Sequence, residues 1–245
     1  MTDVIAPTTV LPAGTELLAP YVEGGALWDT EVHLVATVAR LEPNAGEHAL
    51  LALALAARAT RLRNVCVVLA EVPQQVVDAD DGSDSSTLPW PPLDEWVAAL
   101  EASPIVATPA TADQEPLRPL VWDGRRAYLQ RYWRHEDLAA EELLRLAGAH
   151  DRAEAGDGPV GEALDALFPA PPDGEPDHQR QAAEVALRSG LAVIAGGPGT
   201  GKTRTIARLL VALRLASAGS PRPLQVALAA PTGKAAARMT EAVRL

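Results

Sequence analysis

Residues 196–203 read Gly-Gly-Pro-Gly-Thr-Gly-Lys-Thr, a run whose residue types and spacing suit the binding of phosphate groups. The run matches the pattern G-x-x-x-x-G-K-[ST], with Gly196, Gly201, Lys202 and Thr203 at its fixed positions. Glycines let a loop wrap closely around phosphates, so that its backbone N–H groups point inward. We expect Lys202 to contact the β- and γ-phosphates of ATP, and the Thr203 hydroxyl to coordinate Mg²⁺. The sequence therefore predicts a nucleotide site, hereafter the P-loop, made of Gly196, Gly197, Pro198, Gly199, Thr200, Gly201, Lys202 and Thr203.

The residues on both sides of the P-loop support this interpretation. Residues 191–195 are all apolar and predict a short parallel strand that is buried on both faces. Residues 203–216 repeat apolar side chains at helical spacing, so we expect a helix whose positive end faces the phosphates. A glycine turn that merely joined a strand to a helix would not explain a lysine at the place where phosphate charge would lie.

A second strand and a second lysine follow the P-loop. Residues 224–230 predict another buried strand, which ends in Thr232, Gly233 and Lys234 and opens a helix. The helix start offers N–H donors and a lysine, a combination that suits the phosphates of a nucleic acid. Upstream of the P-loop, Gln179 precedes an amphipathic helix that leads into the first predicted strand.

The order of Gln179, GGPGTGKT and APTGKAAARMTE resembles superfamily 1 DNA helicases. More narrowly, the chain is similar to the RecD family, the alpha subunits of exodeoxyribonuclease V, the RecBCD complex. The phrases RAYLQRYW at residues 126–133 and ALDALFP at residues 163–169 are also similar to that family. The resemblance covers most of the chain, loosely before residue 110 and tightly after residue 176.

The resemblance implies a role for each matching residue. Gln179 would read the adenine, Gly199 to Thr203 would bind the triphosphate, and Thr232, Gly233 and Lys234 would touch single-stranded DNA. The N-terminal domain would dock onto RecB-like and RecC-like subunits. The implied activity is an ATP-dependent DNA helicase, with 5′-to-3′ polarity, that acts in double-strand-break repair and recombination.

Part of the helicase pattern is missing from this sequence. A superfamily 1 helicase also needs an acidic pair that holds Mg²⁺, and a second lobe with arginine fingers, and residues 240–245 supply neither. We therefore expect no complete catalytic set, the N-terminal piece of a longer subunit, and little or no turnover by these residues alone. The alternatives are an AAA-type ATPase, a RecD-like helicase that acts alone, or a non-catalytic partner-binding module. The phosphate-type motif at Lys234 argues against the first of these, and the intact Lys202 and Thr203 argue against the last.

Charge divides the chain into two parts. The formal net charge is −11, but residues 1–175 contain 29 acidic and 11 basic residues, whereas residues 176–245 contain 3 acidic and 10 basic residues. This division is consistent with an acidic module joined to a basic module that binds phosphates. We expect an α/β protein with three parts: a helical, partner-binding domain at 1–147, a Pro- and Gly-rich linker at 148–176, and the start of a RecA-like P-loop domain at 177–245.

The N-terminal part is expected to be mostly helical with a small β-hairpin. Asp123-Gly124 predicts a type I′ turn between two apolar or aromatic runs. Trp122, Tyr128 and their arginine neighbours suit either a base-stacking platform or, as we favour, a hairpin whose aromatic face is packed. The expected helices cover residues 29–40, 48–61, 93–101 and 135–147, and the expected strands lie at residues 64–69 and in the hairpin over residues 119–133.

The remaining features exclude other classes of protein. Cys66 is the single cysteine, so an internal disulfide is excluded and a packed thiol is expected. The apolar run at residues 49–57 is shorter than the ~20 residues of a membrane helix, and the N-terminus lacks a signal peptide pattern. These features predict a cytoplasmic protein without a membrane partner. The acidic cluster at residues 78–84 lacks the spacing of a calcium loop, and we expect a solvated loop there.

Overall fold

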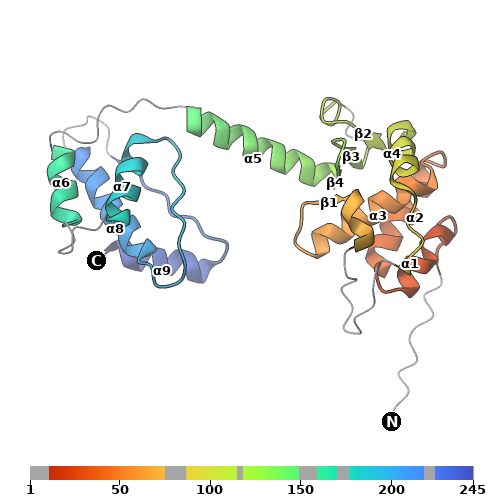
Figure 1. The fold of residues 1–245 in the computed structure, drawn as a ribbon, viewed down its shortest axis with the longest axis horizontal. Helices are drawn as coiled ribbons and strands as arrows, with labels where there is room; N and C mark the ends of the chain where they lie inside the picture. Colours follow the sequence, from red (N-terminus) through yellow and green to blue (C-terminus); the bar gives the residue numbers. More distant parts are fainter. Residues whose placement is uncertain are drawn as a thin grey trace, which may run out of the picture. The chain divides into compact units, whose positions relative to one another are not determined.

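The computed structural model describes residues 11–74, 87–114, 118–148, 159–169, 177–217 and 224–244. The chain divides into two compact units, residues 1–139 and 140–245, which are described separately (Figure 1). The acidic cluster at residues 78–84 and most of the predicted linker lie outside the described residues. The domain limits that the sequence suggests stay a prediction.

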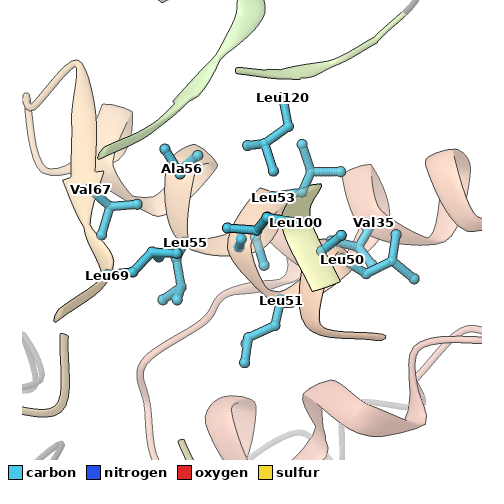
Figure 2. Close-up of a cluster of buried hydrophobic side chains, with 14 of the residues drawn as sticks. Val35, Leu50, Leu51, Leu53, Leu55, Ala56, Val67, Leu69, Leu100 and Leu120 are labelled. Carbon is cyan, nitrogen blue, oxygen red and sulfur yellow. The ribbon is translucent and has the colours of Figure 1, made fainter. Parts of the chain in front are cut away.

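Helices form most of the first unit. The most apolar of them, α3, is buried from Ala49 to Ala56 and lies at the centre of the core. Figure 2 shows Leu53 of α3 packed near Leu100 and Leu120, which come from a helix and a strand far away in sequence. None of the helices in the described ranges is both long and apolar enough to cross a membrane. The helices are η1 (Glu16–Leu18), α1 (Ala19–Glu23), α2 (Asp29–Leu41), α3 (Glu47–Arg61), η2 (Leu69–Gln74) and α4 (Leu93–Ala102), while α5 (Gln130–Gly148) begins in the first unit and ends in the second.

A small mixed sheet covers part of this core. Its strands are β1 (Cys66–Val68), β2 (Val106–Ala107), β3 (Leu120–Trp122) and β4 (Arg126–Leu129), in the order β1-β4-β3-β2. β4 runs antiparallel to β1 and to β3, whereas β2 runs parallel to β3. The predicted hairpin is therefore confirmed, and it recruits two further strands.

The hairpin turn differs from the predicted type. Trp122 pairs with Ala127, so the two central residues of the turn are Gly124 and Arg125. Gly124 has φ +94°, while Arg125 does not have a positive φ, a pattern that belongs to type II′ instead of type I′. The Asp123 carboxylate occupies the position before the turn and accepts hydrogen bonds from the N–H groups of Arg125 (2.9 Å) and Arg126 (2.6 Å). Partial burial alone would raise the pKa of Asp123, but these hydrogen bonds outweigh it and lower that pKa.

Gly124→Ala is expected to lower the free energy of unfolding of the first unit by about 1 kcal/mol, because an alanine is strained at a positive φ. Gly148→Ala is the control: it makes the same change at the end of α5, in the second unit, where the glycine has no positive φ and nothing lies within 4 Å of an added Cβ. The control should be neutral or slightly stabilising. Urea denaturation of both variants measures the difference, and an equal loss in the two would contradict the turn assignment.

The aromatic cluster around the hairpin is packed. Trp122 and Tyr128 are buried, and the rings of Tyr128 and Trp133 meet edge to face with 5.2 Å between centroids. Cys66 is half-buried on the same sheet, and burial raises the pKa of its thiol. The packed interpretation is confirmed for these side chains. α5 follows β4 directly, so it begins at Gln130, five residues before the predicted start at residue 135.

In the described part of the second unit, four helices that follow α5 surround a small core. The piece ALDALF, predicted to lie in the linker, forms the end of α6 and the residue after it, and packs against α7 and α8. Leu164, Phe168, Ala183, Leu187 and Ala212 are the buried residues of this core. The helices are α6 (Pro159–Leu167), α7 (His178–Arg188), α8 (Lys202–Ala216) and α9 (Gly233–Arg244).

The two strands predicted around the P-loop are wrong for this structure. Residues 191–195 and 224–230 are irregular, and Val193 is 86% exposed. A parallel strand obtains its backbone hydrogen bonds from neighbouring strands, and neither segment pairs with a strand in the described part of the chain. Both segments therefore have the apolar residues typical of a buried strand, but no described strand pairs with them.

Candidate nucleotide-binding site

The N-terminus of α7 is fixed by an aspartate. One carboxylate oxygen of Asp177 accepts hydrogen bonds from the N–H groups of Gln179 (2.8 Å) and Arg180 (3.2 Å). An N-cap of this kind satisfies N–H groups that have no partner within the helix. Gln179 is thereby held in the first turn, and its side-chain Nε2 donates to the carbonyl of Thr200, at 3.2 Å. The predicted adenine-reading residue therefore contacts the P-loop.

Two glycines in the left-handed region shape the P-loop. Gly199 has φ +79° and Gly201 has φ +81°, values that residues with a Cβ rarely adopt. Between them, the Thr200 hydroxyl donates to the carbonyl of Gly197, at 3.0 Å. The Lys202 ammonium donates to the carbonyls of Gly196 and Gly197, so it joins the beginning of the loop to the beginning of α8.

Close packing at the loop also requires glycine. A Cβ on Gly201 would lie 2.7 Å from Nε2 of Gln179, and a Cβ on Gly196 would lie 2.7 Å from the Thr200 hydroxyl. The loop leads directly into α8, whose first two residues are Lys202 and Thr203. A helix N-terminus, a lysine and a hydroxyl thus share one end of α8, which fits the phosphates of a nucleotide and a bound cation.

The predicted DNA-contact residues lie at the start of a different helix. Gly233 begins α9, and the Thr232 hydroxyl accepts a hydrogen bond from the N–H of Ala235, at 3.3 Å. Thr232, Gly233 and Lys234 are all exposed. The helix that the sequence predicts here is confirmed, while the strand before it is not.

Sequence reasoning missed two contacts of α7, the helix that carries Gln179. Asp177 could have been found, because an aspartate just before a periodic helix is a typical N-cap. The ion pair between Arg180 of α7 and Asp165 of α6 has no local signal, since the partners lie fifteen positions apart on two helices.

Both units match known protein families. Residues 23–128 match the model of the RecBCD enzyme subunit RecD, N-terminal domain, and residues 179–245 match an AAA domain model. The AAA match implies nucleotide binding. The first match runs from the end of α1 into β4, and the second begins at Gln179.

Individual relatives extend over both units. The chain is 43% identical to the RecBCD enzyme subunit RecD of Mycobacterium tuberculosis (strain CDC 1551 / Oshkosh) over 91% of its length and 35% of that protein. It is 43% identical to RecD of Mycolicibacterium smegmatis over 97% of its length and 37% of that protein, and 29% identical to RecD of Haemophilus influenzae over 62% and 23%. The chain thus spans about a third of the length of the first two relatives. The chain is therefore similar to RecD subunits over both units, with a match to the RecD N-terminal domain followed by a match to an AAA domain.

Proposed function

We propose that this chain supplies the ATP phosphate loop and the first DNA-contact motif of an ATP-dependent DNA helicase subunit. The subunit belongs to a cytoplasmic complex of exodeoxyribonuclease V type and works, with 5′-to-3′ polarity, in double-strand-break repair and recombination. One observation carries the proposal: the Gln179 side chain donates to the Thr200 carbonyl, which joins a base-reading amide to the phosphate loop. Similarity to RecD over both units supports the same assignment.

Each residue has a defined task in this site. The Gln179 amide uses one N–H for Thr200, and its other N–H and its oxygen complement N7 and the N6 amino group of adenine. Gly199 to Thr203 bind the triphosphate through backbone N–H groups and the Lys202 ammonium. Mg²⁺, held in part by the Thr203 hydroxyl, supplies charge that offsets the phosphate oxygens. The positive end of α8 acts in the same direction.

DNA and protein partners bind to different parts of the chain. Thr232, Gly233 and Lys234 contact a phosphate of single-stranded DNA at the start of α9. The acidic N-terminal unit docks onto RecB-like and RecC-like subunits, because its negative charge disfavours DNA. Assembly with those subunits completes the working enzyme.

Lys234→Ala is expected to weaken binding of a labelled oligothymidylate and to lower the salt dependence of that binding by about 0.7 in slope, the share of one phosphate contact. Arg214→Ala is the matched control, because it removes the same charge from the last turn of α8. Fluorescence anisotropy at several salt concentrations measures both. Equal losses in the two variants, or no DNA binding by the wild-type chain, would contradict the DNA-contact role.

A further inference from the structure

Arg180 connects two helices of the second unit. Its Nη2 lies 2.7 Å from Oδ1 of Asp165 on α6, and its Nε donates to Oε1 of Glu184 on α7, at 2.9 Å. Hydrogen bonds raise the pKa of Arg180, the bond to Glu184 more than the bond to Asp165, so the guanidinium stays charged. One carboxylate partner thus lies on its own helix, and the other belongs to α6.

Apolar contacts hold α6 against both neighbouring helices. Phe168, which follows the last turn of α6, is fully buried with Leu164, and both belong to one cluster with Ala183 of α7 and Ala212 of α8. The guanidinium of Arg208 on α8 lies over the Phe168 ring, 5.2 Å from its centroid. Since α8 begins at Lys202, α6 packs on the helix that carries the P-loop lysine, and the ion pair between Asp165 and Arg180 links it to the helix that carries Gln179.

The position of Gln179 is sensitive to small movements of α7. Arg180 is its direct neighbour in the first turn, so a shift of the α7 backbone at Arg180, relative to α6 and α8, moves Gln179 as well. The bond from Gln179 to the Thr200 carbonyl is 3.2 Å long, and a shift of about 0.5 Å would stretch it beyond useful hydrogen-bond geometry. The amide also lies close to Gly201, since a Cβ built on that glycine would be 2.7 Å from Nε2.

We propose that α6 is part of the nucleotide site, and that Asp165 is a positioning residue which acts through Arg180 on Gln179 to favour adenine over guanine nucleotides. This inference rests on the proposed function, in which Gln179 reads the base. Because Nε2 donates to Thr200, Oε1 is oriented to accept from the N6 amino group of adenine. Guanine carries an oxygen acceptor at the equivalent place, which would face Oε1 with no proton between them.

Asp165→Asn tests this role, and Glu184→Gln is its matched control. Each variant removes one carboxylate partner of Arg180, but only Asp165 links it to α6. Asp165 is 69% exposed, so its replacement leaves the fold intact. Calorimetric titration of the full chain with ATP, GTP and tripolyphosphate, each with Mg²⁺, should show the preference for ATP over GTP falling about threefold in Asp165→Asn, the scale of an exposed ion pair. Tripolyphosphate affinity should stay unchanged, and Glu184→Gln should keep the wild-type preference.

The outcomes separate this inference from the proposed function. An unchanged preference in Asp165→Asn, or an equal loss for ATP, GTP and tripolyphosphate, overturns the positioning role alone. Phe168→Leu supplies an independent arm: it should lower the ATP preference while tripolyphosphate still binds, and an unchanged preference there counts against α6. A wild-type chain that binds none of the three ligands overturns the proposed function, and this inference with it.

Discussion

Lys202→Ala is expected to lower the affinity of the chain for Mg·ATP about a hundredfold, the loss of roughly two charge-assisted hydrogen bonds. The ammonium is the point charge that the phosphates would meet, and it also donates to the carbonyls of Gly196 and Gly197. The substitution therefore removes a ligand contact and loosens the loop that makes the others. In a complete helicase subunit that carries these residues, the same change should abolish ATP hydrolysis and leave assembly with partner subunits intact.

Lys234→Ala is the matched control for this prediction. Both lysines follow a glycine at the start of a helix: Lys202 is the first residue of α8, and Lys234 is the second residue of α9. Its replacement should leave the ATP titration unchanged while it weakens DNA binding. ATP affinity that survives in Lys202→Ala, or that falls equally in Lys234→Ala, would sink the assignment of residues 196–203 as the phosphate loop.

Leu53→Ala should have the largest effect on stability, lowering the free energy of unfolding of the first unit by about 3 kcal/mol. Leu53 is fully buried in the middle of α3, within the cluster that joins α3 to α4 and the sheet (Figure 2). Truncation leaves a cavity that the rigid centre of the core fills only in part. Urea denaturation followed by circular dichroism measures the change.

Leu41→Ala makes the same chemical change at an exposed position. Leu41 ends α2 and is 75% exposed, so its truncation should alter the free energy of unfolding by less than about 0.5 kcal/mol. Similar values for the two leucines would contradict the placement of α3 at the centre of the core.

The helices α2, α3 and α4 could be predicted to within one residue because their signals are local, whereas η1, α1 and η2 were not predicted. α3 was expected at residues 48–61 and is found at Glu47–Arg61, since its apolar repeat and the glycine before it lie within the same stretch. The N-terminal cap of α2 could not be predicted from the sequence. It begins after Trp28, whose N–H donates to Oε2 of Glu31 at 2.7 Å, a cap that does not use the usual Ser, Thr, Asp or Asn at this position.

Features that depend on distant partners escaped the sequence. The dipeptide Asp123-Gly124 fits two turn registers. The pairing of Trp122 with Ala127 selects the register in which Gly124 is the first of the two central turn residues. Residues 191–195 have the apolar pattern of a strand, but they do not form one, because no described strand lies beside them to accept their hydrogen bonds. At the site, the loop residues could be located from their spacing, whereas the contacts of Gln179 with Thr200 and of Arg180 with Asp165 exist only once α6, α7 and α8 are packed.

The most direct test of an adenine-nucleotide site is a calorimetric titration of the wild-type 245-residue chain with Mg·ATP and, separately, with Mg·GTP. The hydrogen bond between Gln179 and the P-loop predicts saturable binding at one site, tighter for ATP than for GTP. Absence of saturation with ATP, or equal affinity for the two nucleotides, would contradict it.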